Sequence, residues 1–144
     1  MPLDESPAAT DSGWDAAMQA ATDLVAAFGA HDTRRYFAGF APDATFLFHN
    51  VPGLVESRAA YEALWQDWEK DGFRVAGCRS LNPHLDLITD DVAVFTHDVA
   101  TQLAGESEEQ RERETIVFRR GPNGHWLGVH EHLSAESEPQ GAQQ

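Results

Sequence analysis

The fold follows from residues 111–134, which read RERETIVFRRGPNGHWLGVHEHLS. The run from Arg113 to Phe118 is rich in β-branched and aromatic side chains, as strands prefer. Gly121-Pro122-Asn123-Gly124 has the residues of a tight turn, because glycine and asparagine accept positive φ and proline fixes its own φ. Residues 126–134 then alternate with a period of two and predict the return strand. A hairpin alone is marginally stable, so further strands and a covering helix are expected.

The composition describes one acidic globular domain. The chain has 144 residues, of which 42% are hydrophobic, and its 24 acidic against 10 basic side chains give a formal net charge of −14. A chain of this size can bury a core without disulfides, and an acidic surface repels phosphate backbones, so nucleic acid is not an expected partner. The one cysteine, Cys78, excludes an internal disulfide and is interpreted as a small apolar residue of a strand.

The sequence contains no recognisable targeting or cofactor-binding motif. Residues 1–12 are acidic and lack the apolar centre of a signal peptide, and no apolar run approaches the length of a membrane span. We therefore expect a cytoplasmic protein without a membrane partner. The sequence has no glycine-rich phosphate loop and no serine or cysteine with a base at recognisable spacing, so neither a cofactor nor hydrolase chemistry is predicted.

The rest of the chain predicts helices first and strands afterwards. A tail is expected at residues 1–11, the folded domain at residues 12–134 and a second tail at residues 135–144. Amphipathic spacing and capping residues predict helices, and period-two alternation predicts strands. The predicted helices span residues 14–30, 34–40 and 58–70, and the predicted strands span residues 44–49, 73–88 with a bend at Asn82-Pro83, 92–103, 113–118 and 126–134. Such an order defines an α+β fold whose curved sheet forms an open-mouthed cone.

The second half of the chain carries several distinctive short motifs. They are Leu81-Asn82-Pro83-His84 with Asp90 after it, Glu114-Thr115, Arg119-Arg120, Gly124-His125-Trp126 and the run from Val129 to Ser134. In these motifs and in its order of elements, the chain resembles the nuclear-transport-factor-two-like superfamily, above all its SnoaL-like branch, and also the association (hub) domain of calcium/calmodulin-dependent kinase II. The resemblance implies a cystatin-like cone of three N-terminal helices packed on a strongly curved antiparallel sheet. It implies no single function, because the superfamily includes isomerases, cyclases, dehydratases and assembly domains.

The resemblance also implies where a ligand would lie. The third helix closes the cone in this superfamily, so Tyr61 and Trp65 are expected to touch a ligand. Hub domains hold carboxylate-binding arginines in the cone, and the chain has Val99 and Thr115 at those positions. Arg113, on the strand face of Thr115, would restore a cation there.

His97 is the catalytic candidate. It lies in mid-strand between Phe95 and Val99, where a polar side chain needs a partner or a wet cavity. It is therefore either a satisfied core histidine or a general base. Isomerases and cyclases that the chain resembles use a carboxylate base inside the cone, but the alternation predicts no carboxylate on the face of His97, because Asp98 points the other way.

Arg111 and Arg113 share one strand face. That face either lines the cone, where a guanidinium would bind a ligand carboxylate, or faces outward, where it would pair with nearby glutamates. Arg113 is the better ligand contact of the two.

His130 and His132 share one face of the final strand with Trp126, and Glu131 lies on the other face. The two histidines are metal ligands, ligand contacts, or packing residues at a sheet or dimer surface. Two histidines at this spacing cannot close a metal site by themselves, so no metal is predicted. Trp126 is expected to pack in the core and is also a candidate ligand contact.

Three functions remain open at this point. The first is a small-molecule-binding protein whose apolar cone takes an organic acid or a hydrophobic metabolite, oriented by Arg113 and His97. The second is an isomerase, cyclase or dehydratase in which His97 is the general base. The third is an oligomerisation module of the hub type. A homodimer through the open face of the sheet, with a larger ring as an extension, is expected because apolar strand residues would otherwise be exposed.

Overall fold

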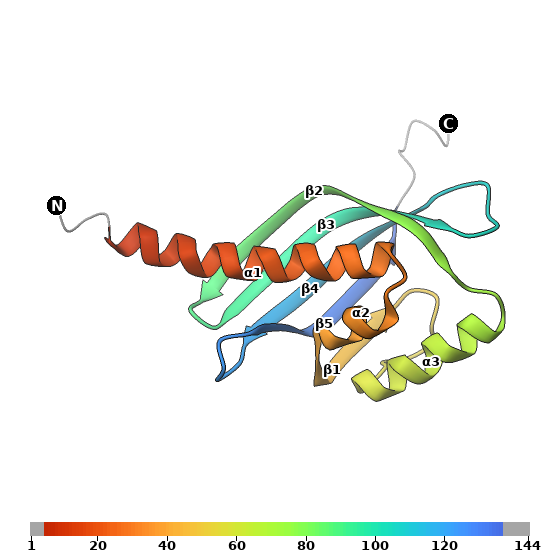
Figure 1. Cartoon of the computed structure of the whole chain (residues 1–144), viewed down its shortest axis with the longest axis horizontal. Coiled ribbons are helices and arrows are strands. Elements are labelled where there is room, and N and C mark those ends of the chain that lie inside the picture. The colour runs from red at the N-terminus through yellow and green to blue at the C-terminus, as the bar shows by residue number, and fades with distance from the viewer. Residues whose placement is uncertain (1–4, 137–144) are drawn as a thin grey trace.

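Three helices pack against one face of a five-stranded sheet (Figure 1). The structure is a computed structural model that describes residues 5–136, with side chains from residue 13 onward. The elements are α1 (Glu5–Gly29), α2 (Thr33–Ala38), β1 (Phe40–Phe48), α3 (Arg58–Lys70), β2 (Val75–Thr89), β3 (Val92–Leu103), β4 (Gln110–Arg120) and β5 (Trp126–Ala135). None of the helices in the described range has both the length and the apolar character that a bilayer crossing requires.

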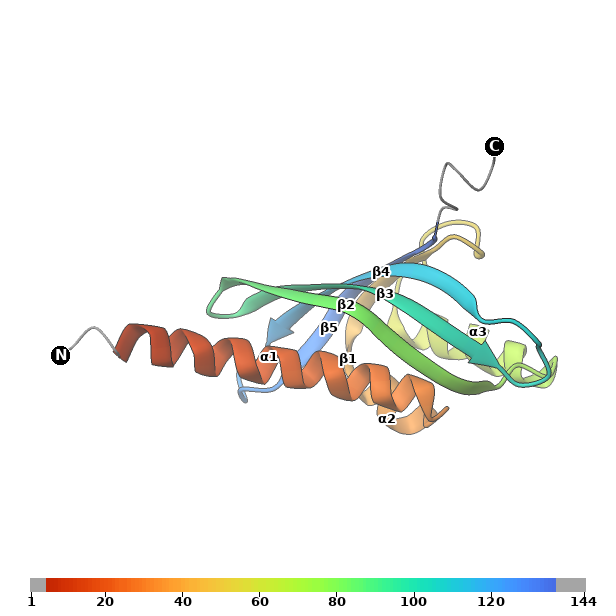
Figure 2. The same cartoon turned by 90° about the horizontal axis from the view of Figure 1, so that it is seen from above.

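The strand order is β1-β5-β4-β3-β2. Strands β2 to β5 form the predicted antiparallel meander, whereas β1 lies beside β5 and runs parallel to it. The sheet is strongly curved, and in the described part of the chain all three helices lie on its concave side while the convex side is uncovered (Figure 2). The predicted α+β cone is confirmed, with one parallel pair that the sequence did not predict.

Capping residues set the helix ends. Ser57 accepts a hydrogen bond from the Ala60 N–H at 3.1 Å, and Asp32 accepts one from the Arg35 N–H at 3.3 Å, as the sequence predicts for the starts of α3 and α2. Helix α1 begins at Glu5 rather than near residue 14, inside the segment expected to be a tail. Pro7 is compatible with this earlier start. Backbone N–H groups in the first helical turn have no acceptor within the helix, so the N–H that proline lacks is not missed there. The tail expected after the domain falls mostly on residues 137–144, outside the described residues.

Helix α1 lies close to the sheet because its inward positions are small. Ala17, Ala21 and Ala27 are buried against the strands, and the Trp14 indole N–H donates to the Leu85 carbonyl oxygen at 2.8 Å. The largest fully buried side chains of the core include Phe40, Phe46, Ile116 and Phe118. Each large apolar side chain buried in this way stabilises the fold by about 1.5–3 kcal/mol.

A bulge in β5 reverses the predicted assignment of its two faces. Phe118 pairs with Gly128 while Val117 pairs with His130, so Val129 is an extra residue without a partner on β4. Gly128 suits this point because an added Cβ would lie 2.8 Å from Cδ1 of Phe40. After the bulge the inward side chains are Glu131 and Leu133, and His130 and His132 point to the convex side. The prediction that Glu131 lies opposite to Trp126 and Gly128 is therefore wrong. The predicted bend of β2 is confirmed by a register shift at Asn82-Pro83.

Candidate functional site

The wide end of the cone contains a cavity of about 90 Å³ between the sheet and the three helices. Aromatic side chains form its helical side, including Tyr36, Tyr61, Trp65 and Trp68. For comparison, an apolar cavity of roughly 150 Å³ admits benzene, so this cavity has room for a compact ligand or for the reactive end of a larger one. In this cavity the fold leaves unfilled space next to polar groups.

A histidine and a glutamate face each other across two strands inside the cavity. His97 of β3 is the register partner of Glu114 of β4, and His97 Nε2 lies 2.6 Å from Glu114 Oε1. The other ring nitrogen, Nδ1, lies 2.6 Å from the Ser80 hydroxyl of β2. Burial alone would raise the pKa of Glu114, but hydrogen bonds with Glu131 and His97 hold it below the usual value. Glu114 is thus ionised, and its carboxylate accepts a hydrogen bond from the N–H at His97 Nε2.

Glu131 is the second carboxyl group of this wall. The bulge of β5 turns it inward next to Glu114, where it is only 3% exposed. Burial, followed by the negative charge of Glu114, raises the pKa of Glu131 well above the usual value, which favours its protonated form. Glu114 and Glu131 therefore act as a carboxyl pair that shares one proton.

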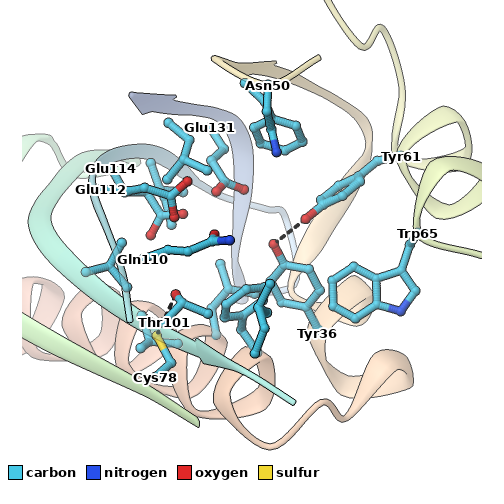
Figure 3. A pocket seen from close by; sticks show the side chains of 18 of the residues that line it. Tyr36, Asn50, Tyr61, Trp65, Cys78, Thr101, Gln110, Glu112, Glu114 and Glu131 are labelled. Carbon is cyan, nitrogen blue, oxygen red and sulfur yellow. Dashed lines mark hydrogen bonds between the residues drawn. The ribbon is translucent and has the colours of Figure 1, made fainter. Parts of the chain in front are cut away.

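A tyrosine pair stands across the cavity from the carboxyl groups (Figure 3). The hydroxyl oxygens of Tyr36 on α2 and Tyr61 on α3 are 2.9 Å apart. Burial is the main cause that raises the pKa of both tyrosines well above the usual value, and the negative charge of the Glu131–Glu114 pair adds to it. Both hydroxyls therefore stay protonated. One of them donates to the other, and the second keeps its hydrogen for another acceptor.

Further polar side chains lie toward the rim of the cavity. Glu112 of β4 lies next to Val99 in the sheet register, and its Oε2 is 2.7 Å from Nε2 of the half-exposed His49. Asn50 and Gln110 also line this side. Cys78 of β2 lines the cavity beside Thr101, and burial raises the pKa of its thiol to about 11. The thiol is therefore neutral and unreactive at neutral pH.

The structure brings together four of the predicted site residues. His97, Tyr61, Trp65 and Val99 all line the cavity. The expectation that no carboxylate shares the face of His97 is wrong, because Glu114 is its direct partner on β4.

The other predicted site residues lie elsewhere. Arg113 and Thr115 point to the convex side, where Arg113 Nε is 3.8 Å from Asp98 Oδ1. Alternation places them there, since Glu112, Glu114 and Ile116 occupy the inward positions of the same strand. Trp126 is buried in the core but does not line the cavity. The bulge at Val129 turns two further candidates to the convex side: His130, whose Nδ1 lies 2.8 Å from the Thr45 hydroxyl, and the exposed His132.

Several polar residues of the site were not recognised from the sequence, among them Tyr36, Glu112, Glu114 and Glu131. The signal for two of them was present. Ile116 and Phe118 are inward apolar residues of β4, and continuing their alternation backwards gives Glu114 and Glu112. Glu131 carries no such signal, because the bulge that turns it inward also breaks the alternation.

Metal ligation is not supported by the side-chain geometry. Within the described part of the chain, no three His, Cys, Asp or Glu side chains are grouped so that they could hold a metal ion. The cavity has aromatic walls and a few polar groups that converge on one region.

The chain belongs to the SnoaL-like domain family, whose model matches residues 17–137. No curated protein matches the sequence. Similar solved structures include a proposed scytalone dehydratase from Novosphingobium aromaticivorans, with a TM-score of 0.74 and 12% identity over 91% of this chain and 89% of that one. A ketosteroid isomerase-like protein from Erwinia carotovora atroseptica gives a TM-score of 0.71 and 15% identity over 86% and 96% of the two chains.

A proposed calcium/calmodulin-dependent protein kinase II association domain from Xanthomonas campestris is also similar. Its TM-score is 0.68, and its 22% identity extends over 81% of this chain and 82% of that one. At these identities the likeness establishes the NTF2-like, cystatin-like cone and leaves the function to the residues of the site.

Proposed function

We propose that this protein is a general acid–base enzyme of the isomerase or dehydratase class, acting on a compact and largely apolar molecule held in the cone. The observation that carries the proposal is a chain of polar groups that crosses an otherwise aromatic cavity. It runs from Ser80 through His97 and Glu114 to Glu131, with Tyr36 and Tyr61 on the far side.

The carboxyl pair would supply the base. Glu114 is held ionised and oriented by His97, and Glu131 beside it holds the one shared proton. Such a pair can take a proton from a carbon next to a carbonyl group and return it to another atom of the ligand. The number of protons is conserved, as an isomerisation requires. In a dehydration, Glu114 would take the proton from carbon and Glu131 would give its proton to the hydroxyl on the neighbouring carbon, so that water leaves and the pair again holds one proton.

The tyrosine pair would stabilise the intermediate. Removal of the proton leaves negative charge on the ligand's carbonyl oxygen, and a protonated phenol in a dry site is a strong donor to such an oxygen. Tyr36 faces the carboxyl groups, and Tyr61 lies in hydrogen-bond distance behind it. The base and the donor thus lie on opposite walls, with the ligand between them.

The alternative of a binding protein for organic acids has less support. The residues that line the cavity include Glu112, Glu114 and Glu131 but neither lysine nor arginine. A carboxylate ligand would therefore enter a negative site without a permanent cation to pair with it, which is costly in a desolvated cavity.

The proposal can be tested without the natural substrate. We expect the wild-type protein to accelerate exchange of α-hydrogens of a small ketone, such as cyclopentanone, for deuterium in heavy water, followed by proton NMR. Glu114→Gln keeps the shape but removes the base, so exchange should fall by about 10²-fold or more. Asp98→Asn removes one negative charge from the opposite face of β3 and should keep the wild-type rate. Equal rates in Glu114→Gln and wild type would contradict the proposal, as would no acceleration above buffer with a series of small ketones.

We also propose that two copies associate through the convex face of the sheet. Support comes from apolar side chains on the convex face: Leu47, which is 38% exposed, and the partly buried Val94, Val117 and Leu127. These side chains form an apolar surface that a second copy would cover. Native mass spectrometry tests this: a monomer at micromolar concentration would contradict it.

A further inference from the structure

The cavity has a strongly asymmetric distribution of charge. Three carboxyl groups lie on the wall formed by β4 and β5, from Glu112, Glu114 and Glu131 (Figure 3). Even with one proton on Glu131, this wall carries the negative charge of the other two carboxylates. The other ionisable groups that face it are His97 on Glu114, His49 on Glu112 and the neutral hydroxyls of Tyr36 and Tyr61.

One oxygen of this wall lacks a partner. Glu131 is 3% exposed, and its Oε1 has no hydrogen-bond partner among the residues that the structure describes. Buried polar atoms in folded proteins nearly always have a partner, so each exception requires an explanation. Since the oxygen borders the cavity, a ligand that donates a hydrogen bond would satisfy it.

The opposite wall consists of aromatic rings. Tyr61 and Trp65 have their ring centroids 6.2 Å apart, and Trp68 and Phe73 continue the surface. Faces of aromatic rings attract cations, most strongly where water is excluded. Carboxylates on one side and aromatic faces on the other form the surroundings that bind organic ammonium groups.

We infer that the ligand of this cavity carries a protonated amine on a small apolar body. Its ammonium group would donate to Oε1 of Glu131 and lie in the field of Glu112 and Glu114, and its apolar part would pack on the aromatic wall. This inference rests on the proposal that the cone binds a small-molecule substrate, and it names the charge class of that substrate. An inorganic cation fits less well, because the described residues contain no grouping that could ligate a metal ion.

The experiment compares three probes of one shape: isobutylammonium, isobutanol and isobutyrate. The isobutyl body is chosen for a cavity smaller than the roughly 150 Å³ that takes benzene. Each probe is titrated into the full chain at neutral pH and constant physiological salt, which screens the attraction of the acidic surface. Binding is followed by ¹⁵N–¹H NMR shifts of cavity residues such as Thr101 and Gln110.

We expect the ammonium probe to bind about tenfold or more tightly than isobutanol, which corresponds to one well-formed charged contact. Isobutyrate should give no saturable shifts. Glu112→Gln removes a negative charge and should weaken the ammonium probe by about tenfold while leaving isobutanol within about twofold. Glu131→Gln replaces a carboxyl group that already favours its neutral form, so it should weaken the ammonium probe by less. Asp98→Asn is the matched control, because it removes the same charge from the convex side and should leave all three affinities unchanged.

Three results would overturn the inference: equal binding of the ammonium and alcohol probes, tighter binding of isobutyrate, or loss of ammonium binding in Asp98→Asn but not in the cavity variants. If Glu131→Gln does not fold, Glu112→Gln decides alone, because its side chain lies nearer the rim. Failure of the proposed function would look different. Ketone exchange would be absent while the ammonium probe still binds, whereas failure of this inference would leave ketone exchange intact.

Discussion

Strands β3 and β4 carry two neighbouring pairs of opposite character, one on each face of the sheet. On the concave side, His97 and Glu114 are 2.6 Å apart, with side chains that are 0% and 13% exposed. On the convex side, in the adjacent register pair, Asp98 and Arg113 are 3.8 Å apart, with side chains that are 32% and 62% exposed. Both pairs join the same two strands, and they differ in how much water reaches them.

This difference decides which pair can do chemistry. In water, opposite charges gain little from each other, and exposed ion pairs contribute about 0–1 kcal/mol. In the cavity, the same interactions are strong enough to hold Glu114 ionised and to keep the adjacent Glu131 protonated. The concave face therefore stores a proton at a defined place, whereas the convex face provides charge for solubility or for a partner.

The largest expected effect is the cost of breaking the inner pair. His97→Ala leaves the Glu114 carboxylate and the Ser80 hydroxyl without their partner and enlarges the cavity, so the free energy of unfolding should fall by about 3 kcal/mol. Asp98→Ala breaks the outer pair and should cost no more than about 0.5 kcal/mol. Urea denaturation measures both. Similar losses in the two variants would show that the faces are not energetically distinct.

The second effect is a change in the pH dependence of stability. The pKa of Glu131 is raised in the fold, so its contribution to stability is full below the usual glutamate pKa of about 4.3 and is lost as pH rises toward the folded pKa. Glutamine does not ionise, so Glu131→Gln does not lose stability in this way as the pH rises. As pH rises above the usual glutamate pKa, the stability of Glu131→Gln relative to wild type should therefore rise, by up to about 1.4 kcal/mol per pH unit.

Urea denaturation at a series of pH values above the sequence pI of about 4.6 gives this difference directly. Glu108→Gln, in the exposed loop between β3 and β4, is the matched control and should follow the wild type at every pH. A constant offset between Glu131→Gln and wild type would mean that Glu131 is already ionised throughout the range.

The fold could be predicted from the sequence wherever apolar and polar side chains alternate regularly along a strand. The capping residues Ser57 and Asp32 and the regular β3–β4 pair allowed the cone to be predicted, because local signals and tertiary packing agree there. The carboxyl wall was missed for two reasons. Glutamates at inward positions contradict the expectation that such positions are apolar, and the extra residue Val129 reverses the face of every residue after it.

A smaller change in the free energy of unfolding is expected from a substitution at Gly128, next to the bulge of β5. In Gly128→Ala the new Cβ would lie 2.8 Å from Phe40 Cδ1 and 3.4 Å from Ile116 Cγ2 on the concave side, so packing strain should cost about 1–2 kcal/mol. Gly77→Ala is the control, because an added Cβ there meets nothing within 4 Å. It should be neutral or stabilise the strand by up to about 0.5 kcal/mol. Thermal or urea unfolding of the two variants would contradict the packing argument if Gly128→Ala were the more stable.

The smallest effect is expected from Arg113→Ala, on the convex face. Its guanidinium is mostly exposed and pairs loosely with Asp98, so its loss should change the free energy of unfolding by less than about 0.5 kcal/mol. The affinity for isobutylammonium should also stay unchanged, since the sheet separates this side chain from the cavity and salt screens the remaining field. Loss of probe binding would place the ligand on the convex face and refute the division of roles between the two sides. A loss of stability well above this value, together with a smaller mass in native mass spectrometry, would instead show that Arg113 is buried between two copies, since only water exclusion makes such a pair strong.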